Sequence, residues 1–223
     1  MLINEKTLTF LGENRLRDSR DWFEEHKADY KQQVEAPLLA LAEEIAAKIE
    51  HLDPAMTLQP RKTLSRIWRD VRFSRDKTTF REEAWLVFRR GKGMEYPAFF
   101  VEISPVMWRY GMGYYCAPTK VMERMHELVL VGDRRYLAAQ KAIERLEGFS
   151  IEGDLYKRPR YPDRTPAERE WLERRGFAVI RNEAEPGVLF TEELAGTLVK
   201  AFEDLAPVYR FLVEIHAEYA GEE

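Results

Sequence analysis

The residues best suited to chemistry in this sequence lie in one short basic segment, Ser65 to Lys77. Within these thirteen residues, five cations and two carboxylates are interleaved with large apolar side chains. The planar guanidinium of arginine donates two parallel hydrogen bonds to a carboxylate or phosphate, so a row of arginines suits an anionic ligand. We therefore predict a pocket in which aspartates orient the cations around such a ligand. Its candidate residues are Arg66, Arg69, Asp70, Arg72, Arg75, Asp76 and Lys77.

The same segment has a purely structural interpretation. If it is an extended strand, its side chains alternate between two faces, and Arg69 lies on the apolar face with Ile67 and Val71. A buried guanidinium must be paired and hydrogen-bonded, so Arg69 requires either a carboxylate or a ligand. The structural alternative is a network of ion pairs that joins a sheet to the preceding helices. Its expected partners are Asp21, Glu24 and Glu25.

The charge of the chain is distributed unevenly. The net charge is −4, which argues against indiscriminate binding of nucleic acid, so a nucleic-acid partner is not expected. Residues 61–92 nevertheless hold eleven Lys or Arg and four Asp or Glu, a balance of +7, while the rest of the chain has a balance of −11. One basic segment in an acidic protein fits a localised anionic small molecule. The alternative is a nucleic-acid or protein interaction module with an exposed basic patch.

Other motifs do not define a reaction. The four histidines have neither i,i+4 spacing among themselves nor a neighbouring cysteine, so no zinc or other metal site is predicted and no cofactor is indicated. The sequence has no Gly-x-Ser-x-Gly elbow and no Walker loop. Whether the protein is an enzyme therefore stays open. The loop from Lys157 to Arg164 is a second basic segment, which either folds over a ligand or is simply solvated.

Hydrophobic spacing predicts helices at both ends of the chain. A short helix is expected over Thr7 to Glu13, and a longer helical block follows the N-cap Ser19, with Pro37 either starting a new helix or kinking the first. Further helices are expected after Pro118, over residues 134–147, over residues 166–175 and after Thr191, the last one divided near Pro207. Residues 149–164 are expected to form a loop.

The middle of the chain has the composition of strands. Strands are predicted over residues 64–73, 85–88, 98–103 and 106–115, with a further edge strand over residues 177–180. The connections between the middle strands are short, which favours antiparallel pairing. The predicted fold is therefore α+β, with one antiparallel sheet of about four or five strands packed against N-terminal and C-terminal helices. We expect a single domain spanning residues 1–223.

The composition is that of an ordinary globular protein, with 45% hydrophobic and 33% charged residues. No signal peptide or membrane span is predicted, and the single cysteine, Cys116, is expected to be a buried apolar residue in a reducing compartment. A cytoplasmic location is therefore expected. The oligomeric state is left open.

Several of these residues also resemble a known family. Asn14, the run Asp21-Trp22-Phe23, Lys27 and Tyr30, together with Arg69-Asp70-x-Arg72-Phe73-Ser74-x-Asp76-Lys77, resemble a widespread family known as domain of unknown function 2461. The resemblance covers nearly the whole chain and implies a single-domain protein. It implies no activity, because none is assigned to the family. The sequence departs from the family pattern at Thr79-Phe80-Arg81, where members have Pro-Tyr-Lys, and at Arg160-Tyr161, where members have Gly-Tyr.

Overall fold

The structure is a computed structural model that describes residues 2–72, 75–91 and 95–221. The chain divides into two compact units. Unit 1 consists of Met1–Phe88, Phe100–Tyr110 and Asn182–Lys200, and unit 2 consists of Arg89–Phe99, Gly111–Arg181 and Ala201–Glu223. The candidate residues 66–77 all belong to unit 1.

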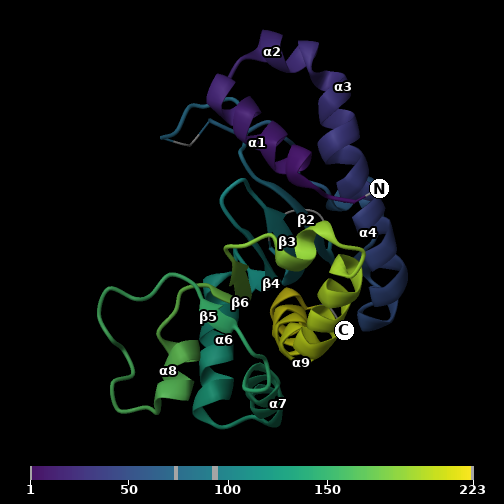
Figure 1. The fold of residues 1–223 in the computed structure, drawn as a ribbon. Coiled ribbons are helices and arrows are strands. Elements are labelled where there is room, and N and C mark those ends of the chain that lie inside the picture. The colour runs from purple at the N-terminus through teal and green to yellow at the C-terminus, as the bar shows by residue number, and fades with distance from the viewer. Residues whose placement is uncertain (1, 73–74, 92–94, 222–223) are drawn as a thin grey trace. The chain divides into compact units, whose positions relative to one another are not determined.

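The N-terminal helices of unit 1 begin where capping residues allow them. Helix α1 (Glu5–Arg17) starts at Asn4, whose side chain accepts the backbone N–H of Lys6 at 2.9 Å, and α2 (Arg20–Glu25) starts at the predicted N-cap Ser19. Helix α3 (Lys27–Tyr30), the π-helical segment η1 (Lys31–Glu35) and α4 (Ala36–Ile49) then follow without a break (Figure 1). Short helical turns are η2 (Glu50–Leu52), α5 (Pro60–Thr63) and η3 (Gly187–Phe190).

One carbonyl group of the π-helical segment is hydrogen-bonded by a side chain from another helix. Pro37 lacks a backbone N–H, so it cannot donate to the carbonyl of Gln33 one turn earlier. The hydroxyl of Thr7, which is fully buried in α1, donates to this carbonyl instead, at 2.6 Å. Pro37 thus lies in the first turn of α4, as one of the two predicted alternatives had it, and α1 supplies the missing hydrogen bond.

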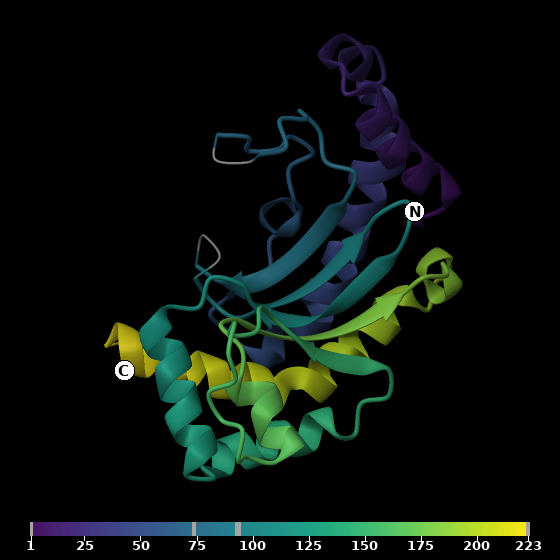
Figure 2. The same cartoon turned by 90° about the vertical axis from the view of Figure 1, so that its left-hand side faces the viewer.

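The predicted α+β class with an antiparallel sheet is confirmed. Six strands occur within the described residues, in the spatial order β1-β2-β3-β4-β6-β5 (Figure 2). They are β1 (Met56–Thr57), β2 (Ala84–Arg90), β3 (Ala98–Ile103), β4 (Trp108–Tyr114), β6 (Phe177–Glu183) and β5 (Phe149–Glu152). Residues 149–152, predicted as loop, form an edge strand with Phe149 opposite Arg181, so β6 is not itself an edge.

The strand predicted over residues 64–73 is wrong for the part that is described, residues 64–72. Only isolated pairs form, Leu64 with Leu86 and Trp68 with Phe80. Side-chain carboxylates take backbone N–H groups that a strand ladder would use: Asp70 accepts from Arg72, and Asp76 accepts from Thr78. Aspartate competes in this way with regular backbone pairing, and the segment is therefore an irregular loop.

Unit 2 contains most of the C-terminal helices. Helix α6 (Thr119–Leu130), α7 (Arg134–Ile143) and α8 (Pro166–Leu172) lie within it, and α8 runs beside α6 in both ribbon views (Figures 1 and 2). Its interior is aromatic, with Trp171 stacked on Phe177 at 4.2 Å and Phe99 stacked on Tyr209 at 4.6 Å. These contacts form an aromatic core within unit 2.

Two further expectations are wrong. The last helix, α9 (Leu194–Ala220), is continuous through Pro207, because the apolar residues on both sides of the proline are buried and hold it in place. Cys116 is exposed, because it lies in the turn between β4 and α6. No helix in the described part of the chain is long and apolar enough to cross a membrane.

Candidate functional site

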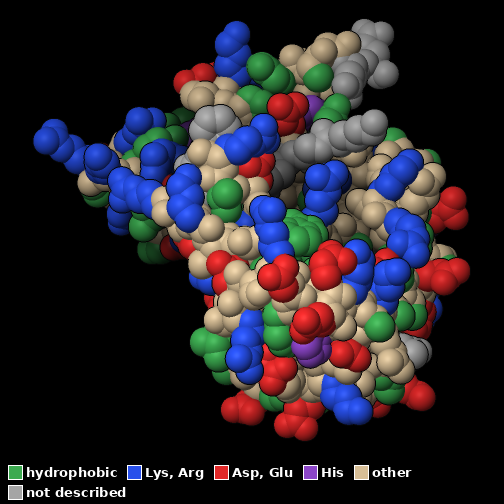
Figure 3. All heavy atoms as spheres, turned by 90° about the horizontal axis from the view of Figure 1, so that it is seen from above, with side chains coloured by type: hydrophobic (Ala, Val, Ile, Leu, Met, Phe, Trp, Pro, Cys, Tyr) green, Lys and Arg blue, Asp and Glu red, His purple; other side chains and the backbone are tan. Residues whose placement is uncertain are grey.

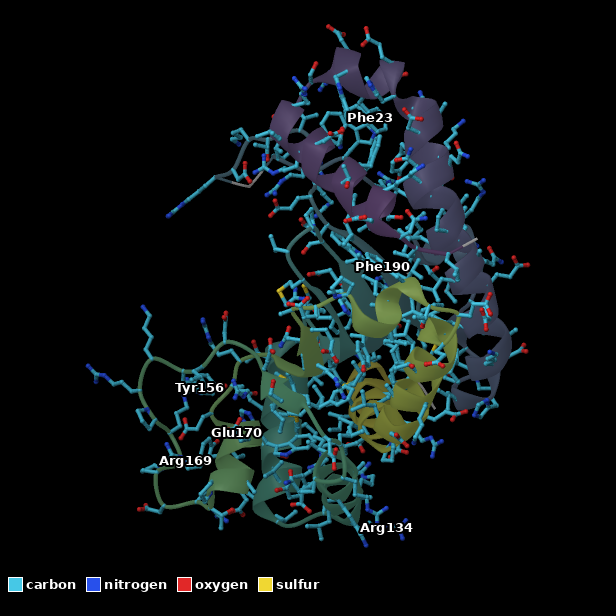
Figure 4. All side chains as sticks on the ribbon, in the orientation of Figure 1. Phe23, Arg134, Tyr156, Arg169, Glu170 and Phe190 are labelled. Carbon is cyan, nitrogen blue, oxygen red and sulfur yellow. The ribbon has the colours of Figure 1, made fainter. Side chains whose placement is uncertain are left out.

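An aromatic cluster fixes the base of the basic segment in unit 1. Phe23, labelled in Figure 4, is buried; its ring centroid lies 5.3 Å from that of Trp68 and 5.0 Å from that of Phe80. Trp68 and Phe80 are themselves 4.5 Å apart. The predicted alternation of faces is wrong for Trp68, which was assigned to the face of the exposed Arg66 and Asp70 but packs against these rings.

Asp76 is the centre of one ion network within the segment. Its Oδ2 lies 3.2 Å from a guanidinium nitrogen of Arg69 and 3.2 Å from one of Arg15, while its Oδ1 accepts the backbone N–H and the hydroxyl of Thr78. The hydrogen bonds from Thr78, followed by the charges of the two arginines, lower the pKa of Asp76. Arg69 therefore has the carboxylate partner that was predicted, but the partner comes from the segment itself and not from α2.

Asp70 and Arg72 form a second, exposed pair. Arg72 donates to both carboxylate oxygens, at 2.9 and 2.6 Å, and this side-chain hydrogen bonding lowers the pKa of Asp70 to about 2. Lys77 donates to the backbone carbonyl of Val71 at 2.8 Å. These interactions turn Asp70, Arg72 and Lys77 toward their own loop.

Arg66 and Arg75 differ from the other candidate cations. Both are exposed, and neither forms an ion pair with any residue that the structure describes. Arg75 lies next to residues 73 and 74 of the motif, which are outside the described residues. Arg66 lines a cavity in unit 1, and the other six candidates are not part of the lining of that cavity.

That cavity is a groove of about 320 Å³ in unit 1. It is bounded by α2, η1 and the start of the basic segment, and its wall combines aromatic rings with cations. The lining residues are Phe23, Lys27, Tyr30, Lys31, Glu35, Leu39, Arg61, Leu64, Ser65, Arg66, Ile67 and Trp68.

The charges of the groove are only partly paired. Lys27 forms an ion pair with Glu24 at 2.8 Å, and Arg61 forms one with Glu35 at 2.7 Å. Lys31 and Arg66 have no carboxylate partner among the residues described. The groove thus carries two uncompensated positive side chains, one from the π-helical segment and one from the basic segment.

Tyr30 gives the groove a neutral hydrogen-bond donor. Burial, followed by the negative charge of Glu35, raises the pKa of Tyr30 to about 12. Its hydroxyl is therefore protonated at neutral pH and can donate to an anion. Sequence patterns did not identify Tyr30 or Lys31 as ligand residues, because both occupy ordinary positions on a predicted helix. The one signal that could have identified Tyr30 was its phenolic hydroxyl at the end of the apolar face of that helix.

Nothing in the described residues resembles a metal centre, since no group of three or more His, Cys, Asp or Glu side chains is placed to hold an ion. Comparison with known families then places the chain. A family described as Conserved hypothetical protein (DUF2461) matches residues 6–211. The chain belongs to the DUF2461 family. No curated protein matches it.

The DUF2461 description carries no ligand and no reaction, so the residues themselves must be interpreted. The residues that carry the family likeness divide between two tasks in the structure. Tyr30 and Lys27 line the groove, whereas Arg69 and Asp76 pair with each other. Asn14 is fully buried in α1, and neither atom of its side-chain amide has a hydrogen-bond partner within the described residues. Several residues of the DUF2461 motif therefore contribute to the structure of the protein and not to the lining of the groove.

Proposed function

We propose that this DUF2461 protein binds a small molecule with a phosphate or carboxylate group in the unit 1 groove. Arg66 and Lys31 supply the charge, the hydroxyl of Tyr30 donates a hydrogen bond, and the ring of Trp68 offers an apolar surface for the rest of the ligand. Arg69, Asp70, Arg72, Asp76 and Lys77 hold the shape of the loop under this proposal, and Arg75 lies outside the groove.

The observation that supports the proposal is the pair of uncompensated cations in a concave surface that also contains aromatic rings. A guanidinium and an ammonium in a groove bind an anion more strongly than on a flat surface, because the neighbouring protein excludes water from part of the contact. Small-molecule sites combine an apolar lining with a few such polar groups. The volume of about 320 Å³ suits a ligand of metabolite size.

An open basic patch for nucleic acid is less well supported. Lys and Arg side chains are scattered over the face shown in Figure 3, with Asp and Glu side chains among them. Within the basic segment, Arg69 and Arg72 are already paired with carboxylates. Binding of a polyanion to such a surface would be weak and steeply salt-dependent, whereas the groove predicts selective binding of small anions.

The first prediction concerns this groove. The probes are inorganic phosphate, citrate and adenosine monophosphate, each tested separately at millimolar concentration. At least one of them is expected to raise the melting temperature of the wild-type protein. Arg66→Gln and Lys31→Gln are each expected to weaken that binding by roughly tenfold, the size of one charge-assisted hydrogen bond. Titration calorimetry measures the affinities directly.

Arg75→Gln and Lys6→Gln are the matched controls, since each removes one exposed positive charge outside the groove. Both controls should bind the probe as the wild type does. The proposal is overturned if no probe shifts the wild-type transition, or if Arg75→Gln weakens binding as much as Arg66→Gln does. Binding that disappears with added salt equally for all probes would instead support the basic-patch alternative.

A further inference from the structure

Unit 2 contains a larger cavity that the basic segment does not touch. Its volume is about 560 Å³, and every residue that lines it belongs to unit 2. One wall is a face of α6, on which Thr119, Glu123 and His126 recur three or four residues apart. The lining extends along α6 to Leu130, a distance of roughly 16 Å at 1.5 Å per residue.

The other wall is the loop between β5 and α8, which is held in a fixed conformation. Glu173 is buried, and its carboxylate accepts the backbone N–H groups of Arg160, at 2.9 Å, and Tyr161, at 2.8 Å. Its backbone carbonyl accepts the N–H of Tyr156 at 2.9 Å. Tyr156 and the neighbouring helix residues Arg169 and Glu170 are labelled in Figure 4. The loop that was identified as a second basic segment is thus held by hydrogen bonds from its backbone to Glu173.

Two charged side chains of this cavity, Arg160 and Glu123, form no ion pair with each other or with any other described residue. Arg160 lies with its guanidinium 3.6 Å from the ring centroid of Tyr156 and makes no ion pair with any described residue. Glu123, on the α6 wall, is likewise without an ion pair in the described chain. A cation and a carboxylate therefore line one cavity from two different elements without neutralising each other.

His126 lies within reach of both charges. Its side chain lines the cavity but is only 5% exposed, and its Nε2 has no hydrogen-bond partner in the described part of the chain. Burial, followed by the positive charge of Arg160, lowers the pKa of His126. Hydrogen bonding to the backbone of Trp171, the negative charge of Glu123 and hydrogen bonding to the backbone of Arg174 act in the opposite direction. A ligand group that hydrogen-bonds to this buried ring nitrogen would supply the missing partner.

Aromatic and aliphatic side chains add apolar surface to the lining of the cavity. The ring planes of Tyr156 and Tyr161 stand edge-on to the His126 imidazole, with centroids 6.3 and 5.9 Å from it. Met122 and Leu130 add aliphatic surface on α6. A ligand that fits must therefore present a negative group, a positive group and an apolar portion at the same time.

We propose that the unit 2 cavity is a binding site for a zwitterionic small molecule, one that carries a carboxylate or phosphate at one end and an ammonium group at the other. Arg160 takes the anionic group, Glu123 takes the ammonium group, and the imidazole of His126 hydrogen-bonds to the ligand between them. The tyrosine rings contact its apolar portion. This site is independent of the groove in unit 1, because no residue lines both.

The test uses ligands that differ only in charge. L-phenylalanine carries both charges, N-acetyl-L-phenylalanine only the negative one, and L-phenylalanine amide only the positive one. Titration calorimetry on the full chain is expected to show binding of L-phenylalanine, with each single-charge compound at least roughly tenfold weaker. O-phosphoethanolamine is titrated as well, to distinguish a phosphate from a carboxylate as the anionic group.

The variants assign each end of the ligand. Arg160→Gln should weaken binding of the zwitterion and leave binding of the amide unchanged. Glu123→Gln should also weaken binding of the zwitterion, but it should leave binding of the N-acetyl compound unchanged. Arg158→Gln and Glu147→Gln remove the same charges outside the cavity and should have no effect. The ¹⁵N resonances of the His126 ring should shift when the zwitterion binds.

Three results would overturn the proposal. The first is no binding of L-phenylalanine or O-phosphoethanolamine to the wild type at millimolar concentration. The second is equal affinity for the zwitterion and the N-acetyl compound, which would indicate a simple anion site. The third is an equal effect of Arg160→Gln and Arg158→Gln. Arg160→Gln and Glu123→Gln leave the lining of the unit 1 groove unchanged, so their effects are distinguishable from those of Arg66→Gln and Lys31→Gln.

Discussion

At the scale of the residue, Glu173 shows how one buried carboxylate can fix a loop. Burial by itself would raise the pKa of Glu173, but the backbone N–H groups of Arg160 and Tyr161 outweigh it, and the pKa is lowered. The ionised form is therefore the one that the fold stabilises. Asp76 plays the corresponding part in the basic segment, where its carboxylate accepts the backbone N–H and the hydroxyl of Thr78 and its pKa is lowered as well.

The lowered pKa of Glu173 predicts a pH-dependent contribution to stability. A carboxylate whose pKa is lower in the folded state stabilises the fold above its unfolded pKa, about 4.3, and loses this contribution as the pH falls through the folded value. Glu173→Gln should therefore reduce the free energy of unfolding by about 1–3 kcal/mol at pH 7, the usual cost of losing hydrogen bonds to a charged group. Below about pH 4 the difference from wild type should shrink.

Urea unfolding at a series of pH values measures this difference. Glu147→Gln, at an exposed glutamate outside the loop, serves as the control and should match the wild type at every pH. A gap between wild type and Glu173→Gln that stays constant from pH 7 to pH 3 would show that the charge of Glu173 plays no part.

Side-chain chemistry could be predicted from the sequence only in part. The apolar neighbours of Arg69 predicted that it requires either a carboxylate or a ligand, and Asp76 supplies a carboxylate. The sequence did not indicate which carboxylate, because that depends on how the loop turns back on itself. Arg66 was identified as a candidate, but its neighbours Tyr30 and Lys31 lie more than thirty residues away in the chain and share no motif with it.

At the scale of the element, the π-helical segment depends on a pair of residues from different helices. The hydroxyl of Thr7 serves the Gln33 carbonyl because Pro37 has no N–H to offer. The segment carries Lys31, so the geometry of the unit 1 groove depends on this arrangement as well.

A double-mutant cycle tests this dependence. Thr7→Val should lower the free energy of unfolding by about 1–3 kcal/mol, since it leaves the Gln33 carbonyl without a partner in the interior. In a Pro37→Ala background the restored N–H can donate to that carbonyl, so the same Thr7→Val change should cost less. Thr7→Ser, which keeps the hydroxyl, is the control. Equal costs in the two backgrounds would contradict the assignment.

The helices and strands that could be predicted are those with a clear hydrophobic periodicity and with capping or turn residues at their ends. Helix α2 begins at the expected N-cap Ser19, and residues 98–103 form the expected strand. The irregular conformation of residues 64–72 could not be predicted. Trp68 packs on Phe23, while Asp18 accepts the backbone N–H groups of Thr79 and Phe80 and Asp76 accepts that of Thr78. Sequence period cannot reveal a competition of this kind.

At the scale of the whole molecule, the two compact units share their secondary structure. Strands β2, β3, β4 and β6 and helix α9 each contribute residues to both units. A strand cannot lose one half of its hydrogen bonds without weakening the other half. We therefore propose that the chain folds as a single domain.

We expect the two units to unfold together. Differential scanning calorimetry should show one transition whose calorimetric and van't Hoff enthalpies agree. Fluorescence offers a second probe, because Trp171 is the only tryptophan of unit 2 and the other four lie in unit 1. Unfolding curves from a Trp171→Phe variant, which reports unit 1 alone, should coincide with those from circular dichroism. Two separate transitions would establish two domains.

The exposed thiol in the turn before α6 has a practical consequence. Cys116 is the only cysteine of the chain, and the next residue, Ala117, lines the unit 2 cavity. A maleimide fluorophore would therefore attach at one defined position, without prior removal of other thiols. The dye would be attached next to a residue that lines this cavity and would serve as an optical reporter in screens of compound libraries.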